Sequence, residues 1–170
     1  MKNKILLDIV ESEFLNINFS KSNETTSPQN MFVIDLYKQN KKYTIYVYCF
    51  LRIIKENQIL LTSSDEFLNK EYRLINEFCK EDDSLIFYNL KNVNNILYKN
   101  KVLSIEFSNT NDLTIVLSEN IKIEIIIDCL LDEFICYKIC ELENNNTNLI
   151  SSFQIKWKFN KIEEEDQNEI

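Results

Sequence analysis

The stretch that most constrains the fold of this chain is Lys101–Asp128, KVLSIEFSNTNDLTIVLSENIKIEIIID. Apolar and polar residues alternate along it in three short runs, which turn-forming residues separate at Ser108–Asp112 and Ser118–Asn120. The apolar residues of the three runs are Leu103, Ile105 and Phe107, then Leu113, Ile115 and Leu117, then Ile121, Ile123, Ile125 and Ile127. Such alternation predicts an antiparallel meander with one buried face and one solvent-facing face.

Further strands are predicted on both sides of the meander. They are Phe14–Phe19, the hairpin Met31–Tyr37 with Tyr43–Ile53, Ile59–Leu61, Glu133–Leu142 and Leu149–Asn160, while Ile5–Val10 fits a strand or a short helix. The run Tyr43–Leu51 is apolar on both faces, which indicates a central strand covered on both sides.

Two helices are predicted in the middle of the chain, at about residues 63–80 and 84–98. Ser63 and Glu66 have the spacing of a capping box at the start of the first helix. The apolar stripe of the second helix consists of Leu85, Ile86, Leu90, Val93, Ile96 and Leu97. The order of strands, two central helices and strands predicts an α+β fold with about seven to nine strands in one or two mainly antiparallel sheets.

We expect a single α+β domain over residues 1–162, because a chain of 170 residues is long enough to bury a core. Residues 163–170 hold five acidic side chains, which predicts a solvated, disordered tail. The net charge of the whole chain is −8, so the body without this segment is only mildly acidic.

The composition excludes several kinds of active site. The sequence has no Gly, no His and no Ala, a bias that an AT-rich genome explains, with Asn expected where Gly would supply left-handed backbone. Without Gly there is no phosphate-binding loop, dinucleotide fingerprint or nucleophile elbow. Without His there is no Ser-His-Asp or Cys-His machinery and no imidazole metal ligand. We therefore predict a non-enzymatic protein without a cofactor.

The five cysteines are Cys49, Cys79, Cys129, Cys136 and Cys140, and all lie within apolar runs. They are predicted to be buried, reduced thiols, and no metal site is expected because a set of further ligands is missing. No apolar run approaches membrane-spanning length and no signal sequence is recognisable, so we expect a cytoplasmic protein without a membrane partner. There is no basic stripe either, which argues against direct binding of nucleic acid.

The candidate partner-binding residues lie on the polar face of the meander and just after it. They are Glu106, Lys122, Glu124, Asp128, Asp132 and Glu133. An acidic patch here would attract a basic partner, although an ordinary solvated face has the same pattern. Tyr46 and Tyr48 share one face of a predicted strand, where they form either a binding platform or buried tyrosines with satisfied hydroxyls.

The whole-chain profile resembles in kind the immunity proteins of bacterial toxin–immunity systems. That profile combines small size, acidic charge, a sheet-rich α+β body and the strand–turn–strand run NDLTIVLSENIKIEIIID. The resemblance implies a single-domain inhibitor that neutralises a cognate, basic toxin by direct binding, often through an acidic surface. Two alternatives stay open: a phage- or plasmid-encoded inhibitor of a host defence nuclease, and an enzyme that works with carboxylates, Lys, Tyr or Cys.

Overall fold

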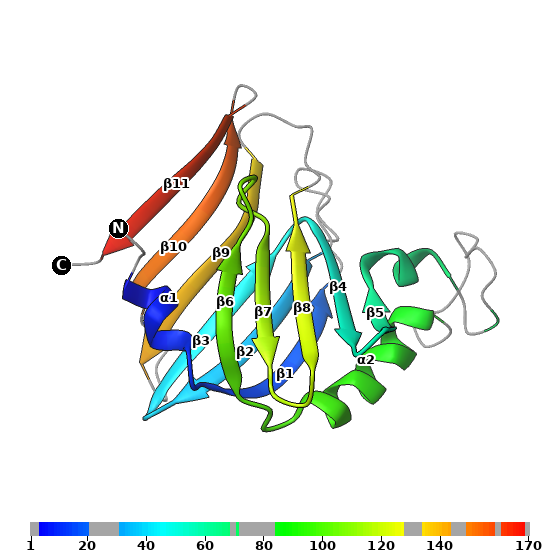
Figure 1. The fold of residues 1–170 in the computed structure, drawn as a ribbon. Helices are drawn as coiled ribbons and strands as arrows, with labels where there is room; N and C mark the ends of the chain where they lie inside the picture. The colour runs from blue at the N-terminus through cyan, green and yellow to red at the C-terminus, as the bar shows by residue number, and fades with distance from the viewer. Residues whose placement is uncertain are drawn as a thin grey trace.

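The computed structural model describes residues 4–20, 31–68, 71, 84–127, 134–143, 149–158 and 161–168. Within these ranges eleven strands form two antiparallel sheets, accompanied by two α-helices and one 3₁₀-helix (Figure 1). The helices are α1 (Lys4–Ile9), the 3₁₀-helix η1 (Ser63–Phe67) and α2 (Leu85–Leu97). The structure confirms the predicted α+β class with mainly antiparallel sheet, and it contains more strands than the sequence predicts.

The strands divide into a six-stranded sheet A and a five-stranded sheet B. Sheet A has the order β1 (Glu13–Ser20), β2 (Met31–Lys38), β3 (Lys41–Val47), β9 (Phe134–Glu143), β10 (Leu149–Lys158) and β11 (Lys161–Asn168). Sheet B has the order β5 (Gln58–Thr62), β4 (Phe50–Lys55), β8 (Ile121–Ile126), β7 (Leu113–Leu117) and β6 (Val102–Phe107).

The two sheets pack face to face, with sheet B in front of sheet A in Figure 1. Their facing side chains form one hydrophobic core, to which α1 and α2 also contribute. Phe107 of sheet B meets Phe153 of sheet A edge to face, with ring centroids 6.3 Å apart. The buried Tyr137 of β9 also bridges the sheets, because its hydroxyl donates a hydrogen bond to the carbonyl oxygen of Asn111 at 2.9 Å. Burial of apolar area between the layers is the main stabilising term of this arrangement.

The meander is confirmed as β6, β7 and β8 of sheet B. All six of its predicted inner residues on β7 and β8 are fully buried: Leu113, Ile115, Leu117, Ile121, Ile123 and Ile125. The prediction for Leu103 is wrong, since this side chain is 52% exposed and Val102 is buried instead. A bulge between Val102 and Ser104 makes Leu103 the extra residue of β6, and this reverses the alternation at that point.

The segment predicted as one strand over Tyr43–Ile53 is two strands in different sheets. β3 belongs to sheet A and β4 to sheet B, and the chain crosses between them at Tyr48 and Cys49. The alternation keeps its phase through the crossing, because Val47 before it and Leu51 after it both face the core. A period-2 pattern that continues in phase contains no signal for a change of sheet.

The second predicted helix is confirmed as α2, and of its predicted apolar stripe only Ile96 is substantially exposed, at 37%. The first predicted helix is a 3₁₀-helix over Ser63–Phe67, and the remainder of the predicted range lies largely outside the described residues. The capping box lies one residue earlier than predicted, at Thr62 and Asp65. Ser63 is unavailable as a cap because its hydroxyl accepts a hydrogen bond from the Leu51 amide at 2.8 Å.

The predicted disordered tail is instead strand β11 over Lys161–Asn168. It pairs along its length with β10, and the Glu165 carboxylate accepts hydrogen bonds from Gln154 at 2.6 Å and Lys156 at 2.8 Å. The charge run alone predicts repulsion and solvation, whereas Lys156 on β10 offsets part of the negative charge and Gln154 supplies a further hydrogen bond. At the other end of the chain, the second of the two alternatives for Ile5–Val10 is correct, since helix α1 spans Lys4–Ile9.

The outer edge of β1 is covered by α2 and by the segment that follows it (Figure 1). The Asn94 side chain of α2 behaves like a neighbouring strand: its Oδ1 accepts from the Ile17 amide at 2.7 Å, and its Nδ2 donates to the Ile17 carbonyl at 2.9 Å. Nearby, the Phe14 amide donates to the Asn100 carbonyl, and the Lys99 amide donates to the Phe14 carbonyl. The backbone groups of this edge therefore have partners at several successive positions.

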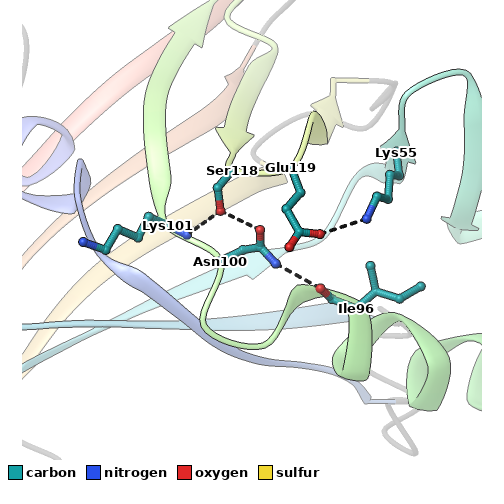
Figure 2. A network of polar contacts seen from close by, with 6 residues as sticks. All are labelled: Lys55, Ile96, Asn100, Lys101, Ser118 and Glu119. Carbon is teal, nitrogen blue, oxygen red and sulfur yellow. Dashed lines mark hydrogen bonds and ion pairs between the residues drawn. The ribbon is translucent and has the colours of Figure 1, made fainter.

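A polar network ties the end of α2 to the β7–β8 turn (Figure 2). The buried Asn100 side chain donates to the Ile96 carbonyl at 2.9 Å and accepts from the Ser118 hydroxyl. The Ser118 hydroxyl in turn accepts from the Lys101 amide at 3.1 Å. In the same turn Glu119 forms an ion pair with Lys55 at 2.9 Å. The network joins three connections at one end of the core, where satisfied polar groups fix the turns.

Candidate partner-binding surfaces

Three of the predicted partner-binding residues, Glu106, Lys122 and Glu124, lie on the outer face of sheet B, which points away from the core. Strand register places Thr62, Arg52, Glu124, Thr114 and Glu106 side by side in one row across the sheet. The neighbouring row is Ile59, Ile54, Lys122, Val116 and Ser104. The outer face of sheet B is thus a mixed surface in which one row is polar and the other is largely aliphatic.

The charges in these two rows are balanced. Arg52 donates to the Glu124 carboxylate from the adjacent strand, so Glu124 is already ion-paired. Glu106 is exposed and accepts from the Ser104 hydroxyl at 3.2 Å, and Lys122 is exposed on the aliphatic row. Two acids therefore face two bases, and the acidic patch expected here is not present in the described part of this face. Sequence reasoning missed Arg52. The available signal was its place between the apolar Leu51 and Ile53, because alternation then directs its side chain to the outer face.

The three remaining predicted residues lie beyond this face in the sequence. Asp128, Asp132 and Glu133 fall outside the described residues. Their predicted role stays a prediction.

The densest acidic segment of the described chain is strand β11, at the end of sheet A. Figure 1 shows it at the far side of the molecule from β4 and β5. Glu164 is exposed, whereas Glu163 and Glu165 are half-buried. The order of sheet A makes β11 its last strand, so its second backbone edge has no neighbouring strand among the described residues. Acidic side chains on such an edge repel acidic chains and attract basic ones.

The predicted tyrosine pair is divided: Tyr46 lies on the outer side of sheet A, and Tyr48 lies just after β3, at the crossing to sheet B. Tyr46 and Tyr48 are half-buried, while Tyr43 points into the core and is 2% exposed. Burial raises the pKa of Tyr46, and the neighbouring Cys140 and Asp35 raise it further. The pKa of Tyr48 is raised mainly by burial as well. Both phenols therefore remain neutral at physiological pH.

Beside these tyrosines runs a row of small polar side chains, Asp35, Thr44, Cys140 and Ser152, all at least nine-tenths buried. Asp35 accepts from the Thr44 hydroxyl at 2.8 Å and forms an ion pair with Lys42 at 3.0 Å. Both oxygens of the Asp35 carboxylate have partners, so we infer that this row stabilises the sheet.

The described cysteines are buried thiols, as predicted. Cys49, Cys136 and Cys140 form no disulfide, and Cys79 and Cys129 fall outside the described residues. Burial raises the pKa of Cys140, which keeps its thiol protonated and weakly nucleophilic. No cluster of three or more Cys, Asp or Glu side chains with metal-binding geometry occurs in the described ranges. The acidic segment Glu81–Asp83 also lies outside these ranges.

A hollow of about 370 Å³ opens at the end of the core where β1, β2 and the β3–β4 crossing meet η1. Its lining residues are Phe19, Phe32, Tyr48, Cys49, Phe50, Ser63, Ser64, Glu66 and Phe67. The rings of Phe19 and Phe32 are buried and packed at 5.0 Å, whereas Phe67 is 58% exposed at the rim. Sequence reasoning missed this site, because its aromatic residues come from four separate elements.

Among the described residues, no helix combines the length and the apolar character that crossing a membrane requires. Comparison with known proteins adds no relative: no protein-family model matches the chain, no curated protein is significantly similar to it, and no solved structure shows a significant likeness to its fold.

Proposed function

We propose that this protein is a non-enzymatic inhibitor of the immunity type, which neutralises a cognate bacterial toxin by binding it directly. The observation that supports this proposal is the position of strand β11. Glu163, Glu164 and Glu165 lie on a paired strand at the end of sheet A, and the exposed Glu164 is open to a basic partner. Acidic groups held in fixed positions attract and orient a basic partner more effectively than the same charges on a flexible segment.

The rest of the charge distribution favours β11 over the meander as the docking region. The outer face of sheet B balances its charges through the pair of Arg52 and Glu124. On β11 four acids, Glu163–Asp166, follow one another directly, and Lys156 pairs with one of them, Glu165. A charged edge also protects a sheet against aggregation, so the function and this protective role must be separated by experiment.

The test uses a candidate toxin encoded beside this chain's gene. The wild-type protein is expected to protect cells that express the toxin and to co-purify with it. The double variant Glu163→Gln with Glu164→Gln removes two negative charges from β11. We expect this variant to lower the association rate constant about tenfold at low salt and less at high salt, because edge charges act mainly on encounter.

Two further variants with the same change in net charge serve as references. Glu56→Gln with Glu119→Gln neutralises two exposed acids in turns, and should leave the association rate within about twofold of wild type. Glu106→Lys tests the meander face predicted from the sequence. A wild-type protein that neither protects nor co-purifies would rule out the inhibitor function. Protection that depends on Glu106 and not on β11 would move the interface to sheet B.

A further inference from the structure

We propose that the aromatic hollow beside η1 receives an arginine side chain of the basic partner. This inference rests on the proposed function, since it names the group by which that partner is held. The hollow is lined by aromatic side chains and by Glu66, and both kinds of group interact favourably with a guanidinium.

The size and depth of the hollow suit a single long side chain. Its volume of about 370 Å³ lies at the lower end of the range for ligand pockets. Among its lining residues Phe32 and Cys49 are buried, at 2% and 8% exposure, whereas Ser64 and Phe67 are exposed. We expect a side chain that enters from solvent to pass the exposed residues and to place its tip near the buried ones.

The walls of the hollow carry the chemistry that a planar cation prefers. Of its nine lining residues, five are aromatic: Phe19, Phe32, Tyr48, Phe50 and Phe67. Aromatic faces attract cations through the ring quadrupole, and a guanidinium also stacks on them as a flat group. Phe19 is held in place by Phe32 at 5.0 Å and by Phe87 of α2 at 6.0 Å, so part of the wall is ordered before any ligand arrives.

The negative charge in the hollow favours a cationic occupant over an uncharged aromatic one. Glu66 is the only charged residue among the described residues of its lining, and the whole chain carries a net charge of −8. Glu66 also takes part in a contact within the protein. A carboxylate has two oxygens with several lone-pair positions, so it can accept from a guanidinium in addition to an existing partner.

An arginine at this place has the character of an interface hot spot. Hot spots are enriched in arginine and aromatic residues and lie in pockets from which water is excluded. The acidic strand β11 acts at a distance on the rate of encounter, whereas the hollow acts on the lifetime of the complex once it has formed.

The experiment uses small probes, so its result does not depend on the identity of the toxin. The full chain, isotopically labelled, is titrated in NMR with N-acetyl-arginine methylamide and, separately, with N-acetyl-citrulline methylamide, its neutral isostere. We expect saturable shifts centred on the amides of Tyr48, Phe50 and Phe67 for the arginine probe, and at least fivefold weaker binding of the citrulline probe.

Two variants complete the test. Glu66→Gln should weaken binding of the arginine probe at least fivefold, whereas the matched control Glu56→Gln, at an exposed turn, should leave it unchanged. Equal binding of the two probes, no saturable shifts at the hollow, or an unchanged affinity in Glu66→Gln would each overturn the inference. Because the toxin is not used, this failure would leave the inhibitor function standing, and failure of protection in cells would leave the probe result standing.

Discussion

At the scale of single residues, the absence of Gly has a visible effect on the backbone. Within the described ranges eight residues have positive φ: Glu11, Gln39, Asn40, Glu56, Lys99, Asn111, Glu119 and Asn120. The sequence predicts Asn at such places, and three of the eight are Asn. The other five carry long side chains, for which the left-handed conformation is unfavourable by about 1–2 kcal/mol. Several turns therefore hold strain that Gly would remove.

This strain predicts that Glu56→Gly stabilises the protein. Glu56 lies in the β4–β5 turn with φ of 55° and an exposed side chain, and its amide donates to the Asn120 carbonyl at 3.0 Å, a bond that the substitution keeps. Relief of strain exceeds the extra entropy of Gly in the unfolded chain, so we expect a gain of about 0.5–1 kcal/mol in the free energy of unfolding. Urea denaturation measures it. Glu56→Ala keeps the Cβ atom and should show no such gain, so an equal gain in both variants would contradict the explanation.

At the scale of elements, the asparagines of α2 show where sequence reasoning reaches its limit. The apolar stripe predicts the helix and its buried residues, but Asn residues lower helix propensity and argue against it. Two of these asparagines form hydrogen bonds with other elements: Asn94 with the backbone of Ile17 in β1, and Asn89, which donates to the buried Asp65 of η1 at 2.8 Å. Such contacts depend on positions 77 and 24 residues away, which no local pattern encodes.

The same limit explains the other errors. The bulge at Leu103 and the crossing at Tyr48 both preserve a plausible alternation, so the pattern predicts strands correctly while misplacing one side chain and one sheet boundary. The acidic run of β11 reads as solvated because its partners, Gln154 and Lys156, belong to a different strand. Local periodicity determines which segments are strands, and contacts distant in sequence determine how these strands are arranged.

The contact between Asn94 and Ile17 gives a prediction for the stability of the β1 edge. In Asn94→Ala the Ile17 amide and carbonyl lose their partners, which should lower the free energy of unfolding by about 1–3 kcal/mol. Hydrogen exchange at the Ile17 amide should accelerate in parallel, because this amide becomes open to water. The exposed neighbour Asn95 supplies the control, since Asn95→Ala changes helix propensity alone. If the two variants have equal stability and the Ile17 amide exchanges at an unchanged rate, Asn94 does not protect this edge.

At the scale of the whole molecule, six described groups have a pKa shifted in the same direction, upward. Burial raises the pKa of Tyr43, Tyr46, Tyr48 and Tyr137 above the ordinary value of 10.0 and that of Cys140 above 9.0. The hydrogen bond to Glu141 raises the pKa of Lys41 above 10.5. In each case the folded state holds its proton to higher pH than the unfolded state does. Stability that depends on these groups is therefore complete below their ordinary pKa values and is lost as the pH rises.

We accordingly predict alkaline destabilisation. The urea midpoint should vary little through these groups between pH 7 and pH 8 and should fall progressively above pH 9, where Cys140 and then the tyrosines ionise in the unfolded chain. Tyr137 should not ionise while the protein is folded, so its contribution to phenolate absorbance should appear only when the protein unfolds. Tyr137→Phe should lose about 0.5–1.5 kcal/mol at pH 7, because its hydrogen bond to Asn111 disappears, but should decline less steeply above pH 10. A midpoint that rises with pH in this window would contradict the direction of these shifts.

The pairing of β3 with β9 also has a consequence for synthesis of the chain. The two strands are joined side by side although about 100 residues separate them, as the ion pair of Lys41 with Glu141 shows. Until β9 has left the ribosome, the edge of β3 that pairs with β9 stays unpaired. Ile45 and Val47, which are buried in the folded protein, remain exposed during this time. Pairings of this sequence separation form slowly, and an unpaired apolar edge promotes association between chains. We therefore expect production of this protein to be sensitive to temperature and translation rate, and chains that stop before β9 to accumulate as aggregates.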